Sequence, residues 1–229
     1  MIFHGFQKMT LLDFPGHVAC TLFTAGCNFR CPFCHNALLV TQIDNEIVYS
    51  EEEILAYLKK RAAILDGVAI TGGEPLMHED LPDFIKKVRA LGYAVKLDTN
   101  GSFPDRLKAI TPLVDYVAMD IKNAPEKYAE TIGVPSYDMS NIFESVSFLK
   151  SGAVAHEFRT TVVSEFHTPE DITAIARWLG PKEDYFLQNF VDSGNLICEN
   201  LHAVPRDTLR SMAANIGSYV HSVHIRGLD

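Results

Sequence analysis

Short segments rich in β-branched and aromatic residues alternate with amphipathic helical segments along most of the chain. An alternation of this kind builds parallel sheets, because a helical crossover returns each strand to the same end of the sheet. The sequence therefore predicts an α/β domain with mainly parallel strands. The segments that we expect to form strands are 18–26, 67–71, 93–99, 114–122, 157–163 and 185–190.

Start and stop signals for helices lie between these segments. Ser50 and the glutamates after it provide an N-cap and an acidic first turn for a helix through about Arg61. Thr168 and Pro169 open another helix with a cap and a proline in the first turn. Further helices are expected at 80–90, 140–150 and 205–216, followed by a short strand at 223–227.

The number of β/α units sets the expected architecture. Roughly six units fall short of the eight that close a TIM barrel, so we expect an open, partial (β/α)6 TIM-like barrel. The 229 residues suit one domain, and neither a linker nor an internal repeat divides them. We therefore treat residues 1–229 as a single domain.

Composition excludes several classes of protein. The apolar runs are shorter than the ~20 residues that span a bilayer, and the N-terminus lacks the pattern of a secretion signal. A net charge of −9 without a basic stripe argues against a nucleic-acid partner. The five cysteines are clustered and odd in number, which suits metal binding in a reducing compartment better than disulfides. We therefore expect a cytoplasmic protein with neither a membrane nor a nucleic-acid partner.

The strongest local motif is the loop after the first predicted strand, where Cys27, Cys31 and Cys34 have the spacing C-x3-C-x2-C. Three thiolates can ligate three irons of a cubane [4Fe-4S] cluster and leave the fourth iron open for a substrate. The alternative is a zinc site with His35 or Cys20 as the fourth ligand. Zinc ligands usually come as two separated pairs, so we favour the iron–sulfur cluster.

The remaining cysteines and several histidines carry no such pattern. Cys20 lies within a strand pattern and Cys198 lies far from the loop, so we expect both to be ordinary thiols. We expect surface positions for five histidines, at His156, His167, His202, His221 and His224.

A glycine motif follows the second predicted strand, at Gly72, Gly73 and Glu74. Paired glycines expose backbone donors and let a ligand approach closely, while a neighbouring carboxylate can pair with an ammonium group. A simple strand-ending turn would have the same composition. The motif is therefore informative only together with the cysteine loop.

Charged residues end the third and fourth predicted strands. Asp98 and Thr99 end the third strand, and Asp120 and Lys122 end the fourth. Because the carboxyl ends of parallel strands meet at one mouth of a barrel, we expect these side chains to converge with the cysteine loop. The alternative is that they form strand-end caps and a surface ion pair of little energetic weight.

The cysteine spacing and the glycine motif together resemble those of the radical SAM superfamily. In that family the open iron chelates S-adenosylmethionine (SAM), and an electron from the cluster releases a 5'-deoxyadenosyl radical that abstracts a hydrogen atom. The resemblance implies that the Gly72–Glu74 motif holds the SAM amino group. It also implies that Phe33 packs near the adenine, with His35 and Asn36 beside it.

Over most of its length, from residues 5–16 to the sixth predicted strand, the chain resembles the glycyl-radical-enzyme activases. This resemblance implies a monovalent-cation site at the SAM carboxylate, formed by Asp98, Thr99 and Asp120, with Lys122 in the active site. Two residues near the ends of strands five and six are candidates for contacts with SAM or a protein substrate, or for structural roles: Arg159 and Gln188.

The opening segment and the loop GCNFRCPFCHN are most similar to the anaerobic ribonucleoside-triphosphate reductase activating proteins. This similarity implies an oxidoreductase that removes a Cα hydrogen from a glycine of the reductase, with a flavodoxin or ferredoxin-like electron donor. One cluster is expected, because residues 35–71 contain no cysteine. The alternatives are a pyruvate formate-lyase-type activating enzyme, a radical SAM enzyme acting on a small molecule, such as a deazapurine synthase, and a non-catalytic metal-binding protein.

Overall fold

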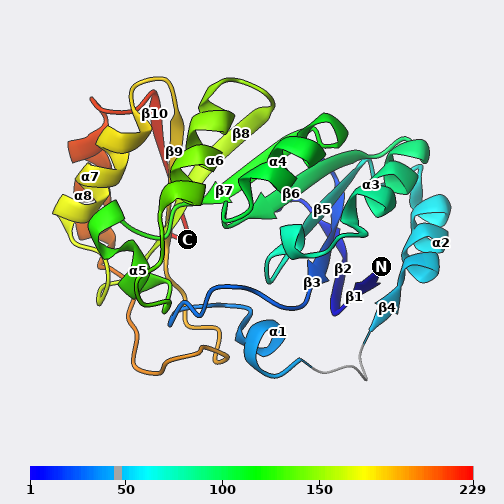
Figure 1. The fold of residues 1–229 in the computed structure, drawn as a ribbon, viewed down its shortest axis with the longest axis horizontal. Coiled ribbons are helices and arrows are strands. Elements are labelled where there is room, and N and C mark those ends of the chain that lie inside the picture. The colour runs from blue at the N-terminus through cyan, green and yellow to red at the C-terminus, as the bar shows by residue number, and fades with distance from the viewer. Residues whose placement is uncertain (44–47, 229) are drawn as a thin grey trace.

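A curved eight-stranded sheet forms the centre of the protein in the computed structural model, which describes residues 1–43 and 48–228. The strands lie side by side in the order β10-β9-β8-β7-β6-β5-β3-β2 (Figure 1). The seven from β10 to β3 are parallel, and β2 runs antiparallel to β3. Their bounds are β2 Gly5–Thr10, β3 Ala19–Thr24, β5 Gly67–Gly72, β6 Ala94–Thr99, β7 Tyr116–Asp120, β8 Ala155–Val162, β9 Asp184–Asn189 and β10 Ser222–Arg226.

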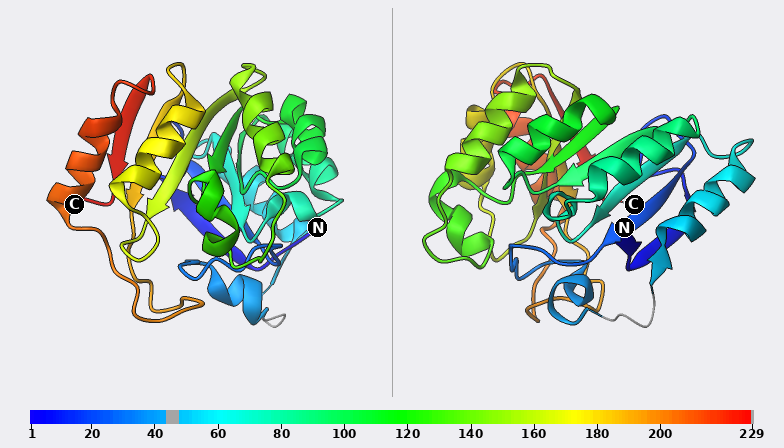
Figure 2. Two further views of the ribbon diagram at one scale, coloured as in Figure 1. Left: turned by 60° about the vertical axis from the view of Figure 1, so that its left-hand side comes forward. Right: turned by 45° about the vertical axis from the view of Figure 1, so that its right-hand side comes forward.

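The longer helices pack along the outer face of this sheet (Figure 1 and Figure 2). They are α2 (Glu51–Arg61), α3 (Leu81–Ala90), α4 (Pro104–Ile110), α6 (Ser140–Lys150), α7 (Pro169–Leu179) and α8 (Arg206–Ile216). The shorter elements are β1 (Ile2–Phe3), β4 (Tyr49–Ser50), α1 (Ala37–Thr41), α5 (Tyr128–Thr131) and the 3-10 turns Pro75–Met77, Thr111–Leu113 and Pro125–Lys127. Within the described residues, no helix is long and apolar enough to cross a membrane.

Local sequence signals explain where the helices begin and which face they bury. Ser50 and Glu53 form a reciprocal capping box at the start of α2, and Thr168 does the same with Asp171 at the start of α7. Along α3, the apolar side chains at positions 81, 84, 85 and 88 are all buried against the sheet. Burying one such side chain stabilises the fold by about 1.5–3 kcal/mol, so this stripe fixes the helix to the sheet.

The predicted partial barrel is confirmed, with two additions. The terminal strand β10 joins the parallel series, and β2 adds an antiparallel edge. Among the described residues, β2 pairs only with β3 and β10 only with β9 within this sheet, so the sheet stays open. Neither β2 nor the seven-residue helix α4 was predicted. β2 is a partly exposed edge strand without alternating burial, and α4 is too short to show a helical period.

Candidate functional site

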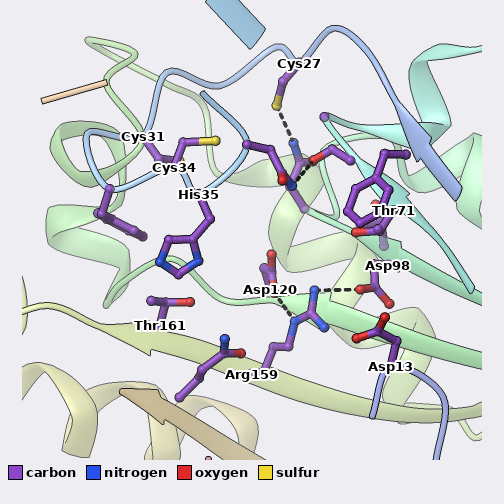
Figure 3. Close-up of a pocket in the computed structure, with 18 of the residues that line it drawn as sticks. Asp13, Cys27, Cys31, Cys34, His35, Thr71, Asp98, Asp120, Arg159 and Thr161 are labelled. Carbon is purple, nitrogen blue, oxygen red and sulfur yellow. Dashed lines mark hydrogen bonds and ion pairs between the residues drawn. The ribbon is translucent and has the colours of Figure 1, made fainter. Parts of the chain in front are cut away.

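The carboxyl ends of the parallel strands surround a cavity of about 500 Å³ (Figure 3). Its lining includes Gln7 of β2 and Arg226 of β10, so the cavity reaches both edges of the open sheet. Of the residues predicted for the site, Glu74 alone lies outside the lining. Those that do line the cavity are Cys27, Cys31, Phe33, Cys34, His35, Asn36, Gly72, Gly73, Asp98, Thr99, Asp120, Lys122, Arg159 and Gln188.

The three cysteines of the loop are free thiols at the top of this cavity. Burial raises the pKa of all three, and that of Cys31 to about 12. A buried thiolate needs a positive partner, which an iron–sulfur cluster provides. Cys27 Sγ also accepts hydrogen bonds from Phe29 N at 3.4 Å and from Asn100 Nδ2 at 3.7 Å. The donor set therefore fits a cluster bound by three thiolates.

The zinc alternative requires His35 or Cys20 as a fourth ligand. Cys20 is buried within β3, and Cys198 is exposed. His35 stacks on Phe190 with ring centroids 5.5 Å apart, and burial lowers its pKa. Its Nε2 atom is buried and has no hydrogen-bond partner within the described part of the chain.

Two glycines join the cysteine loop to the end of β5. Gly73 N donates to Thr24 O at 2.8 Å, and Asn36 Nδ2 donates to Gly72 O at 2.9 Å. Gly72 has a φ of +117°, and a Cβ atom on Gly73 would lie 1.9 Å from Gly26 O. Any larger residue would push these backbones apart, so the glycines are required for the close approach of the two segments.

Glu74 lies behind the cavity wall with a fully buried side chain. Its carboxylate accepts hydrogen bonds from Leu76 N at 3.0 Å, Thr99 Oγ1 at 2.8 Å and Asn100 N at 2.7 Å. Glu74 therefore holds the end of β6 beside the glycine turn. A contact between Glu74 and the SAM amino group stays a prediction.

The pKa of Glu74 gives a first testable result. Burial raises the pKa of Glu74 from 4.5 to about 7. The hydrogen bonds that Glu74 accepts lower the pKa, but burial outweighs them. The folded protein thus binds this proton more tightly than the unfolded chain, so the stabilisation is complete below pH 4.5 and is lost as the pH rises towards 7. We expect wild type to lose about 3 kcal/mol of unfolding free energy relative to Glu74→Gln over this interval. Chemical denaturation of both proteins at several pH values measures the difference, and parallel pH curves would contradict it.

Acidic and basic side chains alternate across the floor of the cavity (Figure 3). Arg159 bridges the two carboxylates: its Nε donates to Asp120 Oδ1, and its Nη2 lies 3.0 Å from Asp98 Oδ2. Lys122 Nζ donates to Asp120 Oδ2 at 2.8 Å, and Lys96 Nζ lies 3.4 Å from Asp98 Oδ1. Each carboxylate therefore already has cationic side chains as partners. Asp98 Oδ1 is buried and makes no hydrogen bond among the described residues, and a monovalent cation at Asp98 and Asp120 stays a prediction.

The pKa values follow from these contacts. Burial acts against the charged form of Asp120, but Arg159 and Lys122 outweigh it and hold the pKa well below its usual range. Burial likewise acts against the charged form of Lys122, yet Asp120 raises its pKa well above the usual value. Lys122 is therefore a fixed cation in this site and not a proton acceptor near neutral pH.

Several residues of the site were missed or misplaced by the sequence analysis. Lys96 lies two residues before Asp98 on β6 and faces the same cavity, a polar alternation with period two that marks an inward polar face. Asn100 follows the predicted Asp98-Thr99 pair directly. The surface position expected for His167 is wrong. His167 is buried, and its Nε2 lies 2.8 Å from Lys122 O, because the ring fills the space between the end of β8 and the Lys122 loop.

Comparisons with known proteins agree with this geometry. The family model described as the Radical SAM superfamily matches residues 21–182. The chain is 29% identical over 233 residues to a protein of Methanocaldococcus jannaschii that is provisionally named a glycyl-radical enzyme activating enzyme, covering 98% of this chain and 95% of that one. It is 25% identical over 189 residues to the pyruvate formate-lyase-activating enzyme of Listeria monocytogenes, covering 77% and 75%. The structure of QueE from Escherichia coli has a similar fold, with a TM-score of 0.58 and 18% identity over 98% of this chain and 93% of that one.

Proposed function

The chain belongs to the radical SAM superfamily, and from this premise we propose that it is an activase that generates a glycyl radical on a partner enzyme. The observation that carries the proposal is the place of the three-thiol loop, at the mouth of a cavity that reaches both edges of an open sheet. Such an opening admits a polypeptide loop, whereas an enzyme for small molecules needs an enclosed pocket. The names of the relatives described above support the same role.

Different residues of the site would bind the cluster and SAM. We infer that Cys27, Cys31 and Cys34 would ligate three irons of a [4Fe-4S] cluster. The backbone of the glycine pair, with Phe33, His35, Asn36 and Gln188, would border SAM. When bound, the cluster and SAM supply the electron and the carbon radical that removes a hydrogen atom from a glycine of the partner. Beside them, the buried ring of Phe33 and the ring of His35, which stacks on Phe190, give this side of the site an apolar surface.

The charged floor of the cavity would orient the amino-acid part of SAM. That part carries one carboxylate and one ammonium group, so it needs both signs of charge within a short distance. Lys122 and Arg159 offer positive charge, and Asp98 and Asp120 offer negative charge. Because these four groups are paired with one another, they are held in place before a ligand arrives. We infer that this preorganisation is their main contribution to binding.

The partner that we propose is the anaerobic ribonucleotide reductase. The similarity of the opening segment and of the loop GCNFRCPFCHN to the activators of that reductase supports this choice. The likeness to a pyruvate formate-lyase-activating enzyme makes formate-lyase the second candidate. A flavodoxin or ferredoxin-like protein would supply the electron. We place this reaction in the cytoplasm and in one domain over residues 1–229.

Electron paramagnetic resonance under anaerobic conditions tests this proposal. The protein is reconstituted with iron and sulfide, reduced with dithionite and mixed with SAM and the candidate reductase. We expect the doublet of a glycyl radical, and a reductase with its radical glycine replaced by alanine should give none. A doublet with formate-lyase alone would change the partner. Cleavage of SAM without a doublet from either partner would overturn the activase role, and no cleavage would overturn the proposed chemistry.

A further inference from the structure

A buried network of amides and hydroxyls lies next to Cys27, and the functions described above do not use it. Its central residue is Asn100, which is 5% exposed and follows the end of β6. Asn100 Nδ2 lies 3.7 Å from Cys27 Sγ. Neither Cys31 nor Cys34 has a contact of this kind from a neutral side chain among those found in the described residues. Cys27 is thus distinguished from the other two thiols.

The orientation of the Asn100 amide is fixed by its neighbours. Its Oδ1 accepts hydrogen bonds from Ser102 N at 2.9 Å and from Ser102 Oγ at 2.5 Å. A backbone N–H can only donate, so the oxygen of the amide must face Ser102 and the NH2 group must face the sulfur. The same NH2 group donates to Asn28 Oδ1 at 3.0 Å. Its two hydrogens are therefore directed at Asn28 and at Cys27.

The backbone of Asn100 is held as firmly as its side chain. Asn100 N donates to the buried carboxylate of Glu74 at 2.7 Å, and the preceding residue, Thr99, the last residue of β6, donates to the same carboxylate through its side chain. The Glu74 carboxylate also accepts a hydrogen bond from Leu76 N, in the 3-10 turn that follows the glycine pair. A displacement of the amide would break several buried hydrogen bonds at once, each of which costs about 1–3 kcal/mol when left unsatisfied.

We propose that Asn100 is a positioning residue that raises the reduction potential of the iron–sulfur cluster through its hydrogen bond to Cys27. The N–H dipole points its positive end at the ligating sulfur. Reduction adds one electron to the cluster and more negative charge to its sulfurs, so the hydrogen bond stabilises the reduced state more than the oxidised state. Burial strengthens this preference, because water does not screen the dipole there. The proposal rests on the cluster that family membership implies, and not on the identity of the partner enzyme.

A redox titration of the reconstituted protein, followed by electron paramagnetic resonance of the reduced cluster, tests the proposal. Asn100→Ala removes the donor, and Asn100→Asp keeps the shape but replaces the donor by an acceptor. We expect a more negative midpoint potential for Asn100→Ala than for wild type, and a still more negative one for Asn100→Asp. The matched control is Asn141→Ala, which removes an amide from an exposed residue that donates to Ser102 O at 3.1 Å without facing a sulfur. Its midpoint should equal that of wild type.

Iron and sulfide analysis accompanies each titration and separates loss of the cluster from a change in potential. A wild-type midpoint in Asn100→Ala or Asn100→Asp with full iron content would overturn the proposal. Failure of both variants to assemble the cluster would also overturn it, because Asn100 would then be needed for folding or assembly rather than for the potential. An equal shift in Asn141→Ala would assign the effect to the turn and not to the hydrogen bond. None of these outcomes depends on whether a glycyl radical forms.

Discussion

Alanine in place of Cys27, Cys31 or Cys34 is expected to abolish assembly of the iron–sulfur cluster. Each thiolate would ligate one iron, so its loss leaves that iron without a protein ligand and the cluster with too few anchors. Burial raises the pKa of all three thiols, so a thiolate at these positions depends on the metal that it ligates. We expect SAM cleavage to fall by more than the ~10–100-fold typical of changes to residues that only support a metal ligand. Iron and sulfide content and visible absorbance measure the loss.

Cys198→Ala is the matched control for these variants. Cys198 is exposed, although its backbone N–H donates to Pro32 O of the cysteine loop at 3.0 Å. The substitution therefore removes a thiol near the loop while keeping that backbone contact, and we expect full iron content and near-normal SAM cleavage. An intact, SAM-cleaving cluster in any of the three loop variants would show that the ligands are assigned wrongly. Loss of iron in Cys198→Ala would show that a fourth thiol takes part.

Strong local signals explain why so much of the fold could be predicted. The helix over 140–150 and the caps at Ser50 and Thr168 occur where the sequence predicts them, because periodicity and capping act over a few residues. β2 escaped prediction for the opposite reason. β2 is a strand because it pairs with β3. Its own sequence shows no alternation of apolar and polar residues, and it includes a glycine and an exposed lysine. The secondary structure of such an edge strand depends on the strand beside it, which the local sequence does not reveal.

The location of the candidate site could be predicted from the sequence, whereas the contacts between its side chains could not. Motifs that end strands led to the cavity, because parallel strands carry their carboxyl ends to one mouth. The side-chain partners within it could not be predicted. Asp98, Asp120 and Arg159 lie on three different strands, and the register of β6, β7 and β8 is what makes them meet. The burial of Glu74 and the direction of the Asn100 amide depend on the same long-range packing.

Arg159→Leu is expected to destabilise the protein by about 3–5 kcal/mol. The guanidinium bridges Asp98 and Asp120, and all three side chains are largely buried, with 18%, 14% and 25% of their side-chain surfaces exposed. Removing it leaves two carboxylates that Lys96 and Lys122 only partly compensate. Since a domain is stable by about 5–15 kcal/mol, this is a large share of the total. We expect SAM affinity to fall in parallel, because the floor of the cavity would rearrange.

Lys108→Ala provides the comparison for Arg159→Leu. Lys108 pairs with Glu144 on the surface, where the lysine is 39% and the glutamate 48% exposed, and such a pair contributes about 0–1 kcal/mol. Denaturant titration should therefore show that Arg159→Leu loses several-fold more unfolding free energy than Lys108→Ala. Equal losses would refute a special role for the buried bridge.

The source of the cost can be tested by removing the carboxylate charges as well. If uncompensated charge destabilises Arg159→Leu, then adding Asp98→Asn and Asp120→Asn should restore part of the lost stability, because neutral amides tolerate the site better than unpaired carboxylates. SAM affinity should stay low in the triple variant, since the charges that would orient its amino-acid part are gone. Stability that falls further in the triple variant would mean that Arg159 acts by packing. A recovery of both stability and SAM affinity would mean that the bridge serves only the fold.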